Sequence, residues 1–516
     1  MANWGMRARH RQYTRPLHAD MTELSKEAVQ MPSLASLSEA KRLLLQKYAR
    51  GEFARELTID SITKRPQETL APLAASQEEV IIREKLVPEI PPLYNESVTI
   101  YRFGSLDVSL LERSFTDVIR RHEIWRTTYA TLNGSMVQVV RPAPDHIHLP
   151  LIDLRPIPKE ERQAEAVRIL SPAACQPFDM QEGPLLRAYL IRFDDEEFRL
   201  YLIVHQSVLD GVSVYQVLLS ELTILYEAYA AGQASPLPEL PIQFGDYAVW
   251  QRRYLRDEIL EEHLSYWQKQ LAGDIPVLAW PQERPRPAQQ TFRGSIHPFV
   301  FPDSLAKSAK TLGLQTGSTL FAVLLGAFTV LLHSYTHQEE FVIGTVSPVG
   351  RKRSEVQRLM GYFLNPVPLR CRLLSTVTFQ ELLNHVQDVV TGALSHDEIP
   401  FEHIVKHQQP RRDPSRNPFF TVAASLEPTL SNVGPQWSLT PMDIESGGAR
   451  WDLYFVWDDR PGGMIGRVQY NPDLFQREEI TAMILDFRRI LEKLIENPRQ
   501  RISELCRESV SVSTKC

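Results

Sequence analysis

The length of the chain, its composition and its charge exclude several classes of protein. With 516 residues, 43% of them hydrophobic and 23% charged, the chain has the composition of a globular protein and is long enough for two hydrophobic cores. A net charge of −6 gives no electrostatic basis for nucleic-acid binding, and no apolar run reaches the roughly 18 residues that a membrane span requires. Four scattered cysteines without a C-x-x-C pair predict no metal site and suit a reducing, cytoplasmic location.

Residues 1–69 contain no candidate catalytic residue. Arginines at positions 7, 9, 11 and 15 precede the first acidic residue, Asp20. A transit peptide, a flexible basic leader and a docking segment for an upstream protein are the alternatives, and the lack of serine in the first 20 residues disfavours the first. Further along, Leu37–Tyr48 predicts a short helix with Ser38 as its N-cap.

The first predicted helix of the next region ends in a polar motif. Its apolar positions between Leu110 and Ile119 recur at helical spacing, and the motif Arg121–Tyr129, RHEIWRTTY, follows. We expect Glu123 and Arg126 to form an ion pair that fixes this helix to the following strand. The motif is therefore interpreted as structural.

A hairpin then leads to the central loop of the chain. The polar turn Asp194–Glu197 joins two strand-like segments, and the second of them, Phe198–Val204, is apolar and β-branched, as in a buried strand. It ends in His205–Gly211, HQSVLDG. Ser213 and Gln216 fit a capping box, which predicts a helix directly afterwards. Polar residues at such a strand-to-helix turn are well placed for binding or catalysis.

The second half of the chain contains further motifs on strong secondary-structure signals. The aromatic segment Phe244–Trp250, FGDYAVW, is expected to pack the join between two halves. Phe321–His333 predicts a long apolar helix, and Phe341–Thr345 predicts a buried strand. Four more blocks follow: Met360–Arg370 (MGYFLNPVPLR), His396–Glu402 (HDEIPFE), Arg412–Phe420 (RDPSRNPFF) and Tyr470–Phe475 (YNPDLF).

These blocks, in this order over roughly residues 70 to 480, resemble the condensation domains of nonribosomal peptide synthetases. His205–Gly211 resembles the family's H-H-x-x-x-D-G motif, and Met360–Arg370 resembles I-G-x-F-V-N-T-x-P-L-R. The resemblance implies an α/β fold of two chloramphenicol-acetyltransferase-like subdomains, residues 70–250 and 251–505, in a V-shaped pseudo-dimer with a central tunnel. Residues 1–69 would then be a leader and connector, and 506–516 a tail.

The resemblance also implies a function in a nonribosomal peptide or hybrid polyketide-peptide assembly line. Such domains are acyltransferases that join a donor acyl thioester to a carrier-bound acceptor. Upstream and downstream carrier proteins would bring both substrates on phosphopantetheine, and the domain, expected to be monomeric, would bind no cofactor itself. The implied site comprises catalytic residues Gln206, His205, Asp210 and Gly211, tunnel residues Ser207, Ser213, Tyr362 and Asn365, and structural residues Arg126, Arg351 and Arg370.

Two positions depart from the family pattern. Gln206 replaces the second histidine, to which the family's catalysis is attributed, and Glu79 replaces an arginine. A glutamine amide cannot titrate, although it can accept a hydrogen bond from an amine or donate one to a thioester oxygen. Neighbouring side chains in extended backbone point in opposite directions, so His205 should face the core if Gln206 faces the tunnel.

The rate lost with the catalytic histidine is easier to tolerate for amide formation than for other reactions. A general base contributes about 10²–10⁴ in rate. An α-amino group has a pKa of about 7.7–8.0 and is partly neutral without help, so amide formation can survive by positioning alone. Ester formation, hydrolysis and epimerisation each require a proton to be removed, and they are disfavoured.

The remaining loop residues have structural interpretations. We expect Asp210 to form a salt bridge with Arg351 or, as second choice, Arg370. Gly211 allows close approach of the backbone to a substrate, and the nearby amides could stabilise an oxyanion. Ser207 is a weak nucleophile candidate because no G-x-S-x-G elbow surrounds it.

Three hypotheses follow. The favoured one is an acyltransferase in which Gln206 positions the acceptor. The second is a catalytically silent module that binds carrier proteins or recruits a tailoring enzyme. The third is modified chemistry on a tethered chain, with His396 or Glu402 supplying the acid or base.

Overall fold

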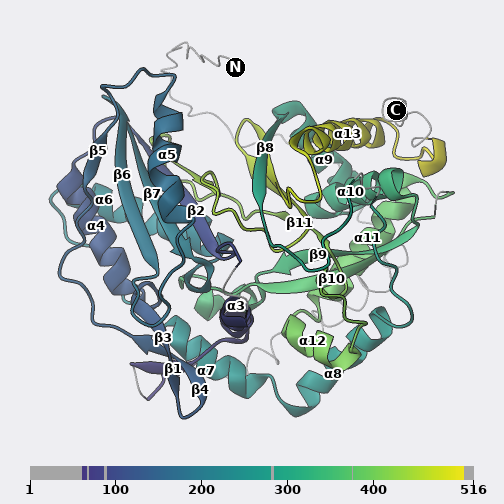
Figure 1. Ribbon diagram of the computed structural model, residues 1–516. Helices are drawn as coiled ribbons and strands as arrows, with labels where there is room; N and C mark the ends of the chain where they lie inside the picture. The colour runs from purple at the N-terminus through teal and green to yellow at the C-terminus, as the bar shows by residue number, and fades with distance from the viewer. Residues whose placement is uncertain (1–60, 67–68, 87–89, 281–283, 375, 505–516) are drawn as a thin grey trace, which may run out of the picture.

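Two α/β halves lie side by side and converge near α3 and α7, as the arms of a V (Figure 1). The computed structural model describes residues 61–66, 69–86, 90–280, 284–374 and 376–504. The predicted helix at 37–48, the basic leader and the tail at 506–516 lie outside these residues. Each half has its own hydrophobic core, as the length of the chain predicts.

The first half is built on a five-stranded sheet of order β12-β2-β7-β6-β5, with a small three-stranded sheet, β1-β4-β3, beside it. Helix α4 covers the larger sheet because Leu111, Phe115 and Val118 recur on one face and are buried. Its elements are β1 (Leu70–Pro72), α3 (Ala75–Leu86), β2 (Asn95–Phe103), α4 (Val108–Arg121), β3 (Thr127–Leu132), β4 (Ser135–Val140), β5 (Leu151–Asp153), α5 (Arg162–Ala174), β6 (Leu186–Asp194), β7 (Glu197–His205), α6 (Leu219–Ala230) and α7 (Phe244–Tyr254).

The second half is built on a six-stranded sheet of order β10-β9-β11-β13-β14-β8. Helix α10 is apolar on all sides and buried in the second core, as the sequence predicts, and β9 is the predicted buried strand. Its elements are α8 (Asp257–Gln270), β8 (Ser295–Pro302), α9 (Asp303–Thr316), α10 (Leu320–Thr336), β9 (Glu340–Ser347), β10 (Asn365–Arg372), α11 (Phe379–Leu394), α12 (Phe401–Gln408), β11 (Val422–Leu426), β12 (Trp437–Pro441), β13 (Leu453–Arg460), β14 (Gly463–Tyr470) and α13 (Arg477–Glu496).

The chain crosses between the halves twice beyond the expected boundary at residue 250. Strand β12 leaves the second half and pairs antiparallel with β2, with Trp437 opposite Arg102. The first core also takes in Met360 and Phe363, which come from the stretch between β9 and β10. These crossings hold the two arms together at their base.

Residues just before position 70 also belong to the folded first half. The buried Arg65 side chain bonds Asp246 at 2.8 Å and Glu123 at 2.6 Å. The predicted pair between Glu123 and Arg126 is therefore wrong, because Glu123 is taken by a residue far away in sequence. Arg126 instead donates to the carbonyl of Arg141 at 2.6 Å.

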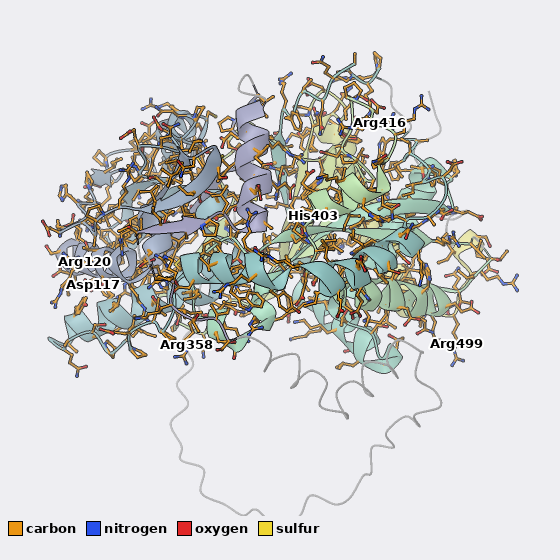
Figure 2. All side chains as sticks on the ribbon, turned by 90° about the horizontal axis from the view of Figure 1, so that it is seen from below. Asp117, Arg120, Arg358, His403, Arg416 and Arg499 are labelled. Atoms are coloured by element: carbon orange, nitrogen blue, oxygen red, sulfur yellow. The ribbon has the colours of Figure 1, made fainter. Side chains whose placement is uncertain are left out.

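The join between the halves also carries charged groups at the lower surface. His403 on α12 lies near the centre of the molecule when it is viewed from below, whereas Asp117 and Arg120 lie at the outer edge of the first half (Figure 2). Partial burial lowers the pKa of His403, and Lys406 adds to the effect. A contact of 3.8 Å between Arg83 and Glu402 links α3 to α12 across the join.

The described helices contain no single one that is long and apolar enough to cross a membrane. Helices α9 and α10 satisfy the criteria of length and composition only together, as a pair bent by 104°.

Candidate active site

The loop after β7 forms the strand-to-helix turn that the sequence predicts. Strand β7 ends at His205, a short 3₁₀ helix η3 (Gln206–Val208) follows, and a helix begins at Gly211. The first turns of that helix are a π-helix, η4 (Ser213–Leu218), which continues into α6. The backbone N–H of Gln206 donates to the carbonyl of Tyr94 at 2.7 Å, which fixes the start of the turn.

His205 faces the core, as the alternation of the strand predicts. Its ring is fully buried; Nδ1 lies 2.7 Å from Ser207 Oγ, and Nε2 lies 2.9 Å from Glu84 Oε2. A carboxylate only accepts, so Nε2 carries a proton toward Glu84. Ser207, His205 and Glu84 are thus linked by a chain of hydrogen bonds. Ser207 is also fully buried, however, and it lies outside the cavity described below. The place of Ser207 in the tunnel therefore stays a prediction, which this cavity does not support.

Asp210 is the anchor of the loop. Its Oδ1 accepts from Arg351 Nη2 at 2.9 Å and from the backbone N–H of Ser213 at 2.7 Å, while Oδ2 accepts from the N–H of Phe363 at 3.3 Å. The predicted salt bridge with Arg351 is confirmed. The second candidate, Arg370, bonds Glu340 at 2.7 Å instead.

Ser213 is not the helix N-cap that the capping-box pattern predicts, because Asp210 occupies that role. The hydroxyl of Ser213 instead donates to the carbonyl of Gly361 at 3.0 Å and accepts from Arg351 at 2.7 Å. The Ser213 hydroxyl therefore connects the helix to the segment between β9 and β10. Ser213 does not line the cavity, so its place in the tunnel stays a prediction.

Tyr362 and Asn365, also predicted in the tunnel, are structural in the same way. Tyr362 is 2% exposed and packs with Tyr94 in a small hydrophobic cluster. Asn365 Nδ2 donates to the carbonyls of Asp397 and Ile399, both at 2.7 Å. Its Oδ1 accepts from a backbone N–H at the start of α12 at 3.0 Å. Tyr362 thus packs the second half against the first, whereas Asn365 connects the start of β10 to the start of α12.

A cavity of about 110 Å³ lies between the halves beside the loop. Three predicted site residues line it: Gln206, Asp210 and Gly211. The charged side chains that the sequence analysis missed are Glu96 on β2, Glu427 after β11, Arg450 before β13 and Arg467 on β14. A charged residue inside a mainly apolar strand was the available signal for Arg467, whereas Glu96 lies between two polar residues and gave no such signal.

Gln206 and Glu96 face each other in this cavity. Gln206 Nε2 donates to Glu96 Oε1 at 2.6 Å. Gln206 is 3% exposed, and its carbonyl oxygen Oε1 is buried without a hydrogen-bond partner among the described residues. Burial raises the pKa of Glu96 to about 7. The site therefore offers one open acceptor and one carboxyl that titrates near neutrality.

The opposite wall carries a second pair and a stacked cation. Arg467 donates to Glu427 at 2.5 Å, and burial raises the pKa of that carboxyl. The Arg450 guanidinium lies over the Trp451 ring at 4.6 Å from its centroid. The cavity is thus polar on both sides, with its permanent charges nearly balanced.

The departure at Glu79 does not leave the region without a positive charge. Glu79 lies 3.6 Å from Arg83 on the same helix, and burial raises the pKa of the Glu79 carboxyl. Arg83 and Arg450 both interact electrostatically with it. Arg83, one turn further along α3, therefore supplies a positive charge in place of the arginine that Glu79 replaces.

Neither alternative acid or base lies at the cavity. The His396 ring stacks on Tyr266 at 3.9 Å between centroids, and its Nδ1 lies 2.9 Å from the carbonyl of Gly392. Glu402 contacts Arg83 on the outside of the join. Neither side chain lines the cavity, so the structure gives no support to the third hypothesis.

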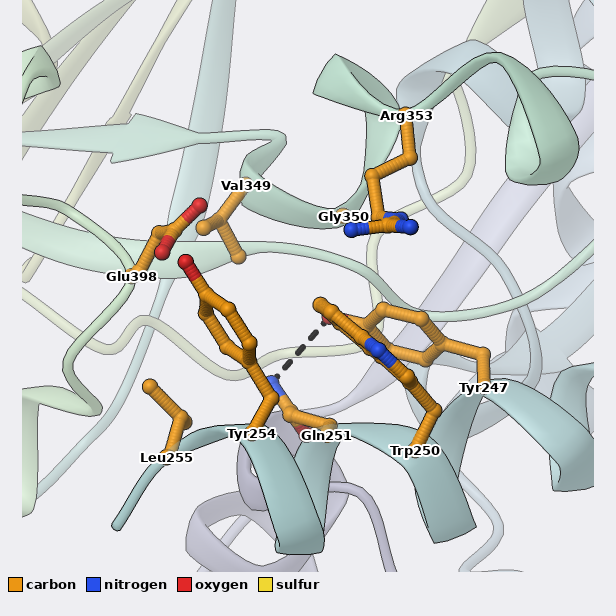
Figure 3. Close-up of a pocket in the computed structure, with 9 residues that line it drawn as sticks. All are labelled: Tyr247, Trp250, Gln251, Tyr254, Leu255, Val349, Gly350, Arg353 and Glu398. Carbon is orange, nitrogen blue, oxygen red and sulfur yellow. Dashed lines mark hydrogen bonds between the residues drawn. The ribbon is translucent and has the colours of Figure 1, made fainter. Parts of the chain in front are cut away.

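A smaller pocket of about 20 Å³ marks the join itself (Figure 3). Tyr247 and Trp250 from α7 face the short helix η5 (Val349–Lys352), and Gln251 Nε2 donates to the Tyr247 hydroxyl at 3.1 Å. The Arg353 guanidinium lies over the Trp250 ring. The predicted role of the aromatic segment in packing the join is confirmed.

One group of described residues has the geometry of a metal site, away from the cavity. His146 and His148 lie 3.1 Å and 2.8 Å from the carboxylate of Glu112 on α4. Glu112 Oε1 also accepts from the backbone N–H of Leu149 at 2.7 Å. Both imidazoles are more than half exposed, so hydrogen bonding to the carboxylate accounts for this group.

Two chloramphenicol-acetyltransferase-like halves around a shared cavity define the class of fold to which the molecule belongs. A family model described as "Condensation domain" matches residues 67–509. The chain therefore belongs to the condensation-domain family of nonribosomal peptide synthetases. Condensation domains of these assembly lines work with carrier protein domains and are generally acyltransferases.

The similar proteins support this assignment. A linear gramicidin synthase polypeptide of Brevibacillus parabrevis is 38% identical over 407 residues, which cover 78% of this chain and 8% of the relative. Phosphinothricin tripeptide synthetase PhsC of Streptomyces viridochromogenes is 33% identical over 452 residues, which cover 86% of this chain and 41% of that protein. The chain thus spans less than half of either relative.

Solved structures show the same fold. The X-domain from teicoplanin biosynthesis is 26% identical, with a TM-score of 0.72 over 86% of this chain and 99% of that one. The first condensation domain of the CDA synthetase is 20% identical, with a TM-score of 0.75 over 85% and 98% of the two chains. The latter likeness speaks for the fold alone.

Proposed function

We propose that the chain is a condensation-type acyltransferase domain that joins a donor acyl thioester to a carrier-bound acceptor amine, with Gln206 as the group that positions the amine. The observation that carries the proposal is the state of the Gln206 amide. Its nitrogen is held by Glu96 at 2.6 Å, and its oxygen is buried without a partner among the residues described. A buried, unpaired acceptor in a cavity is suited to an amine N–H.

The helix start supplies the second half of the mechanism. Gly211 and Val212 line the cavity and are the first residues of the helix, so their N–H groups have no intrahelical acceptor. The oxyanion that forms when the amine attacks the thioester carbonyl would be stabilised there. Gln206 would hold the amine in line for attack, which is a contribution from orientation.

The partners and setting belong to the same proposal. Both substrates arrive on phosphopantetheine arms of an upstream and a downstream carrier domain, one on each side of the cavity, and the domain itself binds no cofactor. The setting is a nonribosomal or hybrid polyketide-peptide assembly line in the cytoplasm, with the domain acting as a monomer.

The second candidate is a non-catalytic recruitment module. Its support is the likeness to the teicoplanin X-domain, which has also been solved as a complex with OxyB; that X-domain is 25% identical to this chain. The replacement of the second histidine by Gln206 favours this candidate as well. Occupation of the Gln206 oxygen by a substrate amine would favour the first candidate.

The test is the intact mass of two carrier proteins, one loaded with an acyl thioester and one with an aminoacyl thioester. Wild type is expected to move the acyl group onto the amine, and Gln206→Ala is expected to lose at least tenfold in rate. The recruitment module would be favoured if wild type binds loaded carriers and a tailoring enzyme but transfers no acyl group.

A further inference from the structure

Among the described residues, Glu96 is the one titratable side chain that forms a hydrogen bond with the Gln206 side chain. It lies near the start of β2, where the register places it opposite Val204 on β7, two residues before Gln206. Its neighbours along the strand are Asn95 and Ser97, which are bonded to other parts of the first half and to the segment after β12. Strand pairing therefore delivers this carboxyl to the cavity next to the loop.

The hydrogen bonding of Glu96 leaves one oxygen open. Its Oε1 accepts from Gln206 Nε2 at 2.6 Å, and Oε2 has no hydrogen bond within the described part of the chain. Because a carboxylate has no donor, the Gln206 amide presents its nitrogen to it, which leaves the amide oxygen buried without a partner among the described residues. A substrate amine on the Gln206 oxygen would therefore be a close neighbour of the open carboxylate oxygen.

Burial and four nearby charged groups determine the pKa of Glu96. The charged groups that act on it are Arg450, Arg467, Glu427 and Asp210. Three of the four are already paired: Asp210 with Arg351, and Glu427 and Arg467 with each other. Burial dominates over both arginines and raises the pKa of Glu96 to about 7, which is the range in which a general base is most effective.

We propose that Glu96 is the proton acceptor of the condensation step, in place of the histidine that the chain lacks, for the α-amine of a carrier-tethered acceptor. This inference rests on the proposed function. Gln206 and Glu96 divide two tasks: the amide orients the amine, and the carboxylate takes its proton.

The step balances without any other reagent. The neutral amine nitrogen attacks the thioester carbonyl, a C–N bond forms, and the nitrogen becomes positively charged. Glu96 takes one N–H proton, the C–S bond breaks, and the thiolate leaves. The proton then passes from the carboxyl to sulfur, which is downhill because a simple thiol such as cysteine has a pKa of about 8.5.

Glu96→Gln separates proton transfer from positioning. The new amide oxygen can still accept from Gln206 Nε2, so the orientation of that side chain is preserved, but the position no longer titrates. The assay is single-turnover transfer from pH 5 to pH 9, with an acceptor whose amine is neutral throughout the range. We expect the wild-type rate to rise with an inflection near pH 7, and Glu96→Gln to be about 100-fold slower with that inflection absent.

Asp443→Asn is the matched control. Asp443 is a second partly buried carboxyl beside β2, where Thr99 donates to it at 2.6 Å, and burial raises its pKa as well. It does not line the cavity, so its removal should leave the pH profile unchanged. A rescue experiment uses the double variant Glu96→Gln with Gln206→His, which returns a titrating base to this side of the cavity. Its rate should be at least tenfold higher than that of Glu96→Gln alone.

The outcomes distinguish the two proposals. Wild type that is active without an inflection near pH 7, or Glu96→Gln at the wild-type rate, overturns the role of Glu96 and leaves the acyltransferase proposal in place. Wild type that is inert at every pH overturns the proposed function together with this inference. If Glu96→Gln does not fold, the wild-type pH profile alone decides.

Discussion

The two sides of the loop after β7 differ in how completely their polar groups are paired. On one side, here called the underside, Asp210, which also borders the cavity, forms hydrogen bonds with Arg351 and Ser213. These three residues also bond several backbone groups, and the distances lie between 2.6 and 3.5 Å. On the cavity side, Gln206 Oε1 has no partner and Glu96 is bonded through one oxygen only, among the described residues.

This difference separates residues that hold the fold from residues that await a ligand. Buried polar groups in folded proteins are nearly always hydrogen-bonded, so an exception in a cavity calls for an explanation. At this loop the family motif is retained on the paired side and altered on the open side. The underside therefore serves the scaffold, whereas the cavity side is where the chemistry of this chain departs from the family pattern.

The largest expected effect is on the paired side. Arg351→Leu leaves Asp210 buried without its cation and should reduce the free energy of unfolding by about 3–5 kcal/mol. Urea denaturation measures it. The matched variant Arg126→Leu removes an arginine whose guanidinium donates to the carbonyl of Arg141, and it should cost less than about 1.5 kcal/mol. Equal losses of unfolding free energy in the two variants would show that the Asp210–Arg351 pair has no special structural role.

Gly211 lies where the two sides meet. An added Cβ would lie 3.0 Å from Glu427 Oε2 and 3.2 Å from Pro428 Cδ, both on the opposite wall. Gly211→Val should therefore cost about 1–3 kcal/mol and close the cavity, so that transfer is lost while the fold persists. Circular dichroism and the carrier assay check both results; wild-type turnover would show that the cavity is not the reaction site.

A third effect concerns stability and pH on the open side. Glu96 has a folded pKa of about 7 against an ordinary value of 4.5, so the folded protein holds a proton that the unfolded chain has released between these values. Its contribution to stability therefore falls as pH rises from 4.5 to 7. Glu96→Gln should gain stability relative to wild type between about pH 5 and pH 8, as urea titrations at both values would show. A constant difference would mean that Glu96 titrates normally.

Local patterns predicted much of the fold. The hairpin into His205, helix α10 and strand β9 depend on spacing within one segment, and they form as expected. The pair between Asp210 and Arg351 was predicted from the sequence, where Asp210 belongs to the His205–Gly211 motif, and it forms.

Two of the errors share a physical cause, which is competition from distant residues. Arg65 takes Glu123 from the neighbouring Arg126. Glu96 lies 110 positions from Gln206 and reaches it only because β2 pairs with β7. No spacing within one segment reveals such contacts.

The most direct test of the central claim replaces Gln206 by methionine, which matches its length but cannot accept a strong hydrogen bond. Single-turnover transfer between loaded carriers is measured at rising acceptor concentration, beside a binding assay for each carrier. We predict a fall of at least tenfold in the maximal rate with unchanged carrier affinity. A Gln206→Met variant that transfers at the wild-type rate would contradict the positioning role.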